Sequence, residues 1–435
     1  MRRIGDTFDA VTAFFGAALA GIALFLPITF AWTSETTPYR IASLYNSVPR
    51  GAAIGVVVAA ASAVLVTTSA RPLIAWLVAL GGAVGMSVNH FAIRNVSSPD
   101  MLTTQNYIDA ICGGLLLGAL GAAVLRRPLP AFGFALGGVG FFVFGDFADV
   151  LHIKERDPWA VLETPPGWLI GIALALVFLS ACRNRSLGVE SRDPERTIDL
   201  PITPILAATL LALVVLAGSE WLARQYDRAS ESGSHTIEIA VVVGATVIAA
   251  MVAAMLLPGR DGAGLFLAVS LVPTADALGS APRPGWSLLA VLVLTGIGVQ
   301  VGSRLPATSL GIILIAGLSI FAIVTAPHDN GVLYSISSGG LAFTAGYCCG
   351  AVRPRYAPSG ALAIAALYLP SAVSALPNQD GDLPMREGTT DPGTPGRTAL
   401  LVTVGCAIGL AALHRFRPRS RPKPTEPTEP AAAAQ

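Results

Sequence analysis

Apolar residues in this chain come in long blocks, and short polar segments that hold most of the charges separate them. Most blocks are about twenty residues long, the length that an α-helix needs to cross the roughly 30 Å hydrocarbon core of a bilayer. Only a helix satisfies all of its backbone polar groups within one such segment, so each block predicts one membrane helix. The predicted helices are 9–32, 51–69, 72–93, 106–125, 129–150, 166–182, 201–223, 237–257, 262–278, 286–303, 306–326, 332–352, 359–376 and 398–414.

The composition also indicates a membrane protein. The 435 residues are 53% hydrophobic and 13% charged, with a mean hydropathy of +0.65, whereas soluble domains carry about 25% charged residues. The sequence therefore predicts an all-α polytopic membrane protein. The first apolar block is too long for the core of a signal peptide and has no clear cleavage site, so we expect it to be retained as a helix.

Basic residues predict the orientation, because Lys and Arg are enriched in cytoplasmic loops. Arginines recur at every second junction between apolar blocks, starting with Arg2 and Arg3 and ending with the basic segment from Arg415. Both termini are therefore predicted to be cytoplasmic. The composition, rich in Ala, Gly, Val and Arg and poor in Lys, is typical of a bacterium with a GC-rich genome, so we expect the bacterial inner (plasma) membrane.

The chain contains an internal repeat. Gly113–Pro128 reads GGLLLGALGAAVLRRP and Gly339–Pro354 reads GGLAFTAGYCCGAVRP, and similar flanking segments follow in the same order around both. An even number of helices in each copy makes the repeats parallel, related by an axis along the membrane normal. The predicted regions are a six-helix bundle at 1–182, a cytoplasmic linker at 183–200, an inserted helix pair at 201–257, a second six-helix bundle at 258–414 and a disordered cytoplasmic tail at 415–435.

Two patterns within the repeat are candidates for function. The junction between the second and third helices contains Arg71, and its counterpart in the second copy contains Gly302 and Arg304. In the fourth helix, Asp109 lies four residues before Gly113. An intramembrane carboxylate is costly unless it faces a cavity or a partner, so it is a functional candidate by default. The alternative places Asp109 at the outer interface, hydrated beside Asn106.

The arrangement of six, two and six helices, with these two patterns, resembles the fourteen-helix branch of the major facilitator superfamily, typically drug/proton antiporters. The resemblance implies that arginines in the short inner loops latch the cytoplasmic face. The loop at Arg71 lacks the acidic residue of the family pattern, and Asp109 stands where the family has an arginine, so that arginine's role does not transfer. The latch candidates are Arg71, Arg304, Arg127 and Arg353.

The resemblance also implies a secondary transporter that works by alternating access. Few charges in the helix centres favour a small apolar or amphipathic substrate, which we expect to be exported, with protons as the candidate coupling ion. We expect a monomer in the lipid bilayer, without a cofactor. The cysteines lack the spacing of a zinc site, so no metal is expected. The sequence has no stripe of basic residues interleaved with aromatic ones, so no nucleic acid is expected either. The candidate transport and coupling residues are Asp109, Asp276, Asp146 and Asn106.

The sequence does not predict an enzyme, and it keeps a scaffold protein as the alternative to a transporter. A multi-spanning envelope enzyme needs an acidic pair in the first outer loop, where 33–50 offers only Glu35, and no Gly-x-Ser-x-Gly or His-Glu-x-x-His motif is present. A transport-inactive relative that serves as a partner or scaffold in envelope assembly is consistent with the altered loop at Arg71. Solute flux in proteoliposomes distinguishes it from a transporter.

Overall fold

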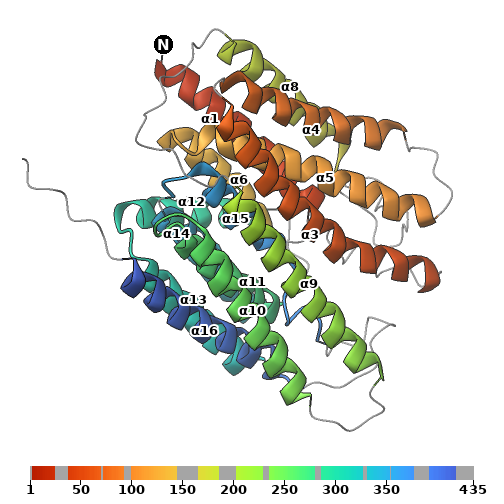
Figure 1. Cartoon of the computed structure of the whole chain (residues 1–435), viewed down its shortest axis with the longest axis vertical. Coiled ribbons are helices and arrows are strands. Elements are labelled where there is room, and N and C mark those ends of the chain that lie inside the picture. The colour runs from red at the N-terminus through yellow and green to blue at the C-terminus, as the bar shows by residue number, and fades with distance from the viewer. Residues whose placement is uncertain are drawn as a thin grey trace, which may run out of the picture.

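A computed structural model describes residues 2–24, 38–69, 72–92, 99–144, 165–185, 202–228, 235–279, 286–326, 331–352, 354–376 and 391–417. In that part of the chain there are fourteen α-helices and one short 3₁₀ helix, η3 (Figure 1). Their bounds are α1 (Arg2–Leu24), α3 (Pro38–Thr68), α4 (Pro72–Ala92), α5 (Pro99–Val124), α6 (Pro128–Phe144), α8 (Gly167–Asn184), α9 (Thr203–Arg228), α10 (Thr236–Leu256), α11 (Gly262–Leu278), α12 (Ser287–Arg304), α13 (Thr308–Thr325), α14 (Gly331–Ala351), α15 (Ala357–Ala365), η3 (Ala366–Tyr368) and α16 (Thr394–Phe416).

Each predicted helix corresponds to one α-helix, but the prediction of a single helix over 359–376 was wrong. The α-helix ends at Ala365 and the chain continues as η3 to Tyr368. Pro370 explains the break, because proline has no backbone N–H to donate and disfavours helical geometry at the residue before it. A turn beyond Pro370 is held by Ser371, whose hydroxyl oxygen accepts hydrogen bonds from the N–H groups of Val373 at 3.0 Å and Ser374 at 3.2 Å.

The helices form two bundles with the same internal contacts, as the predicted parallel repeat requires. In the first bundle α5 packs on α3, α4 and α1, while α8 packs on α4 and α1, and α6 packs on α1. In the second bundle α14 packs on α12, α13 and α11, while α16 packs on α13 and α11, and α15 packs on α11. The first bundle lies in the upper part of Figure 1 and the second in the lower part. The fold class is therefore confirmed, whereas the residue boundaries of the domains stay predictions.

Glycines allow the central pair of each bundle to cross in direct backbone contact. A Cβ atom at Gly114 or Gly118 of α5 would overlap a carbonyl oxygen of α3. Gly346 and Gly350 of α14 stand in the same relation to carbonyl oxygens of α12. Small residues at four-residue spacing are what membrane helices use for close approach. The repeated sequence thus lies on corresponding helices, although the contact glycines do not align within it: the second pair lies nearer the end of its helix.

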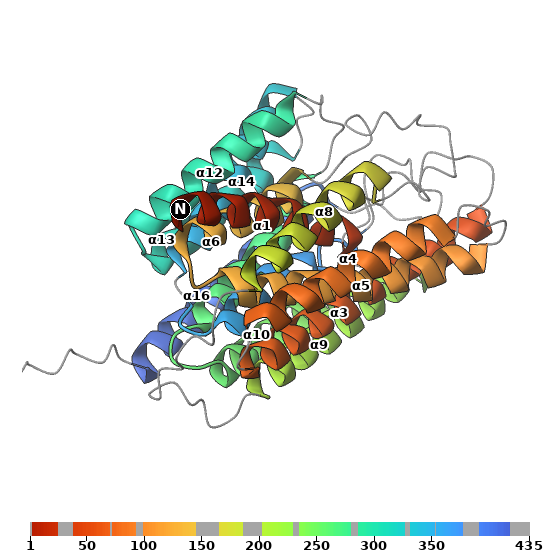
Figure 2. The ribbon, with the colours of Figure 1, turned by 90° about the horizontal axis from the view of Figure 1, so that it is seen from above.

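Two symmetric contacts join the bundles. Helix α6 packs on α12 and α14, and α15 packs on α3 and α5. The view from above shows α6 beside α12 and α14 (Figure 2). The four inner helices α6, α11, α14 and α15 are absent from the ten described helices that are long and apolar enough to span a membrane by themselves. Helix α11 is buried on all sides from Gly262 to Thr274, so neighbouring helices, rather than lipid, surround it.

The inserted pair α9 and α10 is attached to both bundles. Helix α9 packs on α3, where Arg50 donates two hydrogen bonds to Glu220, at 2.6 and 3.1 Å. Helix α10 packs on α11 and α16. At the end of α16, Arg417 donates to the carbonyl oxygen of Met255 at 2.7 Å, which has no partner within α10 because it lies in the last turn. Arg417 also donates to the carbonyl oxygen of Gly259 at 2.8 Å, just after α10. The pair therefore bridges the bundles.

Candidate functional site

A cavity of about 620 Å³ lies between the two bundles. Helix α6 forms its wall on the first bundle, with Phe132, Ala135 and Val139. Helices α11, α12, α14 and α15 form the opposite wall, to which Ala268 and Ala345 belong. The alanines in both walls leave the space open, and its volume falls in the range of about 300–1,000 Å³ that small-molecule sites occupy.

The side chains that line the cavity are almost all apolar. None of the lining residues within the described part of the chain is charged. Gln300 and Ser303, both on α12, are the polar exceptions, and the thiols of Cys348 and Cys349 add polarizable groups on α14. Burying an ion without a partner costs several kcal/mol or more, so this wall disfavours a ligand with a buried charge.

One end of the cavity lies at the face where α1 begins and α16 ends, which we call the arginine face. Contacts between the ends of α1, α5, α8 and α6, and between those of α10, α14 and α16, place these termini together. Arginines are concentrated there: Arg126, Arg127, Arg183, Arg260, Arg304, Arg355 and Arg417. Pro128, Leu129 and Ser303 line the cavity at this end. Val139 and Leu367 line its deeper end.

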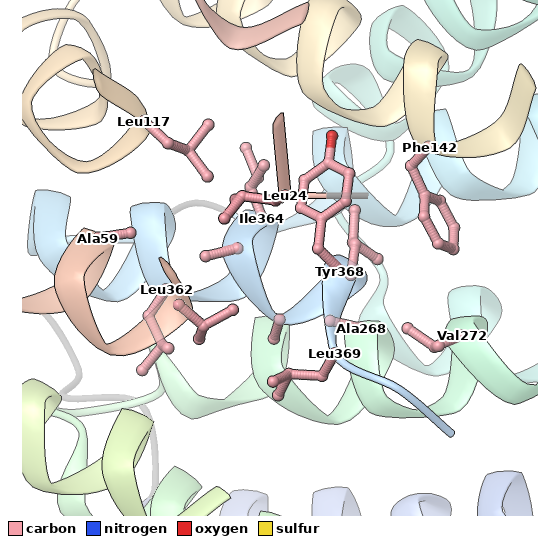
Figure 3. Packing of buried hydrophobic residues seen from close by; sticks show 14 of the residues in the cluster. Leu24, Ala59, Leu117, Phe142, Ala268, Val272, Leu362, Ile364, Tyr368 and Leu369 are labelled. Atoms are coloured by element: carbon pink, nitrogen blue, oxygen red, sulfur yellow. The ribbon is translucent and has the colours of Figure 1, made fainter. Parts of the chain in front are cut away.

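Tyr368 lies directly after Leu367, which lines the deep end of the cavity. It belongs to the second bundle, is 3% exposed, and donates a hydrogen bond from its hydroxyl to the carbonyl oxygen of Gly138 on α6 at 2.6 Å. The ring of Phe142 meets it edge-on at a centroid distance of 6.1 Å. Figure 3 shows Tyr368 between Leu24 and Phe142, above Leu369. The break after α15 positions this side chain, because η3 ends at Tyr368.

A buried ionic network occupies the arginine face of the first bundle. The Asp9 side chain of α1 is fully buried and forms ion pairs with Arg127 at 2.7 Å and Arg183 at 2.5 Å. Ser180 of α8 donates a hydrogen bond to the same carboxylate at 3.2 Å. Arg127 also pairs with Asp6 at 3.1 Å. All of these groups belong to one bundle, so the network holds α1, the α5–α6 junction and α8 together and does not link the two bundles.

The second bundle has an acidic group in a similar place. Asp261 precedes α11, is 4% exposed, and accepts hydrogen bonds from the backbone N–H groups of Arg355 at 3.0 Å and Tyr356 at 2.9 Å. Burial raises the pKa of the Asp261 carboxyl, while these two N–H donors act in the opposite direction. In both bundles an acid near the start of the first helix therefore fixes the junction between the fourth and fifth helices.

The other predicted latch residues have different positions. Arg304 is exposed at the end of α12 and makes no ion pair with the residues that the structure describes. Tyr347 fixes the α12–α13 junction instead, since its buried hydroxyl donates to the carbonyl oxygens of Leu305 at 2.8 Å and Ala307 at 3.1 Å. Arg71 and Arg353 lie outside the described residues.

Asp109 is a buried carboxylate between α5 and α4. It is 6% exposed, lies within the apolar span Thr103–Val124, and accepts a hydrogen bond from the Asn89 amide at 2.9 Å. Asn106, one turn earlier, points instead to α3, where its amide donates to the Ser47 hydroxyl at 3.2 Å. The carboxylate does not line the cavity between the bundles.

Asp276 lies near the end of α11 away from the arginine face. It accepts a hydrogen bond from the Ser371 hydroxyl at 2.5 Å and so holds the turn that follows Tyr368. It does not line the cavity either, and its contacts are separate from those of Asp109. Asp146 lies outside the described residues.

Sequence reasoning missed Tyr368, Tyr347 and Asp9. The two tyrosines had a usable signal, because a tyrosine buried among small residues needs a partner for its hydroxyl. Asp9 lies at the edge of the first apolar block, where a charged residue reads as part of the flanking polar segment. Its partners Arg127 and Arg183 are more than a hundred residues away, and no local pattern indicates such pairs.

Comparisons with known proteins support the fold. No protein-family model matches the chain, and no curated protein matches it by sequence. Among solved structures, the peptide transporter POT in complex with alafosfalin is similar, with a TM-score of 0.53 at 12% identity over 94% of each chain. The inward-open xylose transporter XylE from E. coli gives a TM-score of 0.51 at 13% identity, covering 96% of this chain and 97% of that one.

A third structure, a bacterial homologue of the human drug peptide transporters PepT1 and PepT2, gives a TM-score of 0.53 at 14% identity, covering 94% of this chain and 98% of that one. At these identities the likeness concerns the fold. The chain therefore has the major facilitator superfamily fold that the sequence resemblance predicts. The drug/proton antiporter branch stays a prediction.

The ion pairs of Asp9 predict that replacing Arg127 destabilises the protein, whereas replacing its neighbour Arg126 does not. Arg127→Ala leaves a fully buried carboxylate with one arginine instead of two, and we expect it to lower the free energy of unfolding by about 2 kcal/mol. Arg126→Ala removes an exposed arginine and should change it by less than about 0.5 kcal/mol. Denaturant unfolding in micelles measures both. Equal effects of the two variants would contradict a structural role for the Asp9–Arg127 pair.

Proposed function

We propose that this protein is a secondary transporter that moves a small apolar or amphipathic molecule across the membrane. The observation that supports it is the cavity between two repeated bundles, with one end at the arginine face and the other beside Tyr368. A transporter must expose one site to each side in turn, and a site at the interface of two parallel repeats allows this by rocking of the bundles.

The contacts between the bundles suit such a motion. A rocking motion would have to break the hydrogen bond from Tyr368 to Gly138 and its ring contact with Phe142. It would also have to shift α6 on α12 and α14, and α15 on α3 and α5. The polar part of this interface costs little to break, because one hydrogen bond and an aromatic contact are worth about 1–2 kcal/mol together. Within each bundle, in contrast, glycine contacts and the groups around Asp9 and Asp261 favour movement as a rigid unit.

The charge distribution supports one orientation of the protein, and in that orientation we propose export. Positively charged segments favour the cytoplasmic side, which would put the arginine face and the mouth of the cavity in the cytoplasm. The conformation described here would then load from the cytoplasm. An apolar wall favours a substrate that loses little hydration on entry, which agrees with an apolar or amphipathic compound.

Loss of transport in a filled cavity tests the proposal. In Ala135→Phe/Ala345→Phe, rings from α6 and α14 extend into the cavity from both walls, so we expect flux of an uncharged amphipathic dye in proteoliposomes to fall at least tenfold. Leu213→Phe, at a side chain of α9 that is 62% exposed, should transport like the unaltered protein. Thermal unfolding midpoints equal to that of the unaltered protein would show that both variants fold.

If the unaltered protein moves none of a panel of neutral, cationic and anionic amphiphiles, the transporter proposal fails. Copurification of an envelope protein in that case would favour the scaffold function instead.

Asp109 and Asp276 are proposed as candidates for proton coupling. Because neither carboxylate lines the cavity, coupling would act through helix contacts: protonation of Asp109 would weaken its hydrogen bond from Asn89 and alter the α4–α5 packing. Asp109→Asn should therefore abolish the dependence of dye flux on an imposed pH gradient while leaving downhill flux in place. The same pH-gradient dependence in Asp109→Asn and unaltered vesicles would remove Asp109 from the mechanism.

A further inference from the structure

We infer that the cavity binds a neutral amphiphile with one polar head, whose hydroxyl or amide is held by Gln300 at the arginine face and whose alkyl body extends toward Tyr368. This inference rests on the proposed function and specifies the ligand of the same cavity.

The polar side chains of the cavity lie at one end and on one helix. Gln300 and Ser303 are three residues apart, so both lie on the same side of α12, near its end. The Ser303 hydroxyl donates to the Gln300 backbone carbonyl at 2.8 Å, so its proton is used within the helix. The Gln300 side chain is exposed and has no hydrogen-bond partner among the described residues.

The primary amide of the Gln300 side chain is best paired with a neutral polar group on the ligand. Its oxygen accepts and its NH₂ group donates, so a hydroxyl or an amide on the ligand can form two hydrogen bonds with it. A carboxylate can only accept and an ammonium can only donate. Neither would find an opposite charge in the wall, because the lining residues within the described ranges carry none. Arg304 follows Ser303 directly but does not line the cavity.

The rest of the cavity fits an alkyl body. Along α6 the lining residues run from Pro128 to Val139, about 16 Å at 1.5 Å per residue. The deeper wall consists of side chains such as Leu271, Ile364 and Leu367, which offer no hydrogen bonds. A ligand with a second polar group would therefore leave that group unsatisfied, which restricts the site to molecules with one head.

The test uses decanol that carries a photoreactive diazirine at the far end of its chain, with the full-length protein in lipid nanodiscs. We expect cross-links, mapped by mass spectrometry, at the deep wall around Val139, Leu271 and Leu367. Excess 1-decanol should compete, while decanoate and decyltrimethylammonium should need concentrations at least tenfold higher. In Gln300→Leu, which keeps the size of the side chain, the apparent affinity for decanol should fall about fivefold to tenfold.

Arg304→Leu is the matched control and should leave decanol labelling unchanged. Cross-links outside the cavity, the same affinity in Gln300→Leu, or competition by decanoate equal to that of decanol would each overturn the inference. If decanoate binds better and Arg304→Leu abolishes its binding, the ligand is an anionic amphiphile instead. Specific labelling without any dye flux would refute the transporter proposal and leave the neutral-head site in place, so the two failures are distinguishable.

Discussion

The structure depends on direct contact between helix backbones at glycine. At Gly118 of α5 and at Gly350 of α14, the facing carbonyl oxygen occupies the space that a side chain would need. In a membrane, helices gain little from burying apolar surface against each other, so close van der Waals contact has to supply the association energy. The strongest contacts therefore form within each bundle, between α3 and α5 and between α12 and α14.

The interface between the bundles is built differently, and this difference produces the cavity. Where α6 faces α14, alanines and cysteines leave about 620 Å³ open, and polar groups are confined to the end of α12. Buried acids strengthen each bundle at the arginine face, Asp9 in the first and Asp261 in the second. Beside the other end of the cavity, Tyr368 donates a hydrogen bond across the interface to Gly138 of α6. Two rigid units that can rock about a shared cavity are what alternating access requires.

Hydropathy predicted the number and order of the helices, because a bilayer imposes one length on every span. The repeated segments Gly113–Pro128 and Gly339–Pro354 predicted the duplication. Hydropathy could not predict the end of α15, where Pro370 stops a helix inside an apolar run. Carboxylates within apolar segments made Asp109 and Asp276 candidates, but the structure places both outside the cavity. The sequence did not indicate Gln300, because polar residues at a helix end are common. Which face of a helix meets the cavity depends on tertiary packing, and sequence spacing alone does not determine it.

Distances between the bundles test the central claim, that they rock as rigid units about the cavity. Spin labels on Arg126→Cys and Leu305→Cys would report the arginine face, and labels on Phe91→Cys and Leu289→Cys the opposite face, after replacement of the five native cysteines. Double electron–electron resonance in nanodiscs should give two distances for each pair of labels. Conditions that favour the longer distance at the arginine face should also favour the shorter distance at the opposite face. A single distance at both faces, unchanged across pH and added amphiphile, would contradict the account.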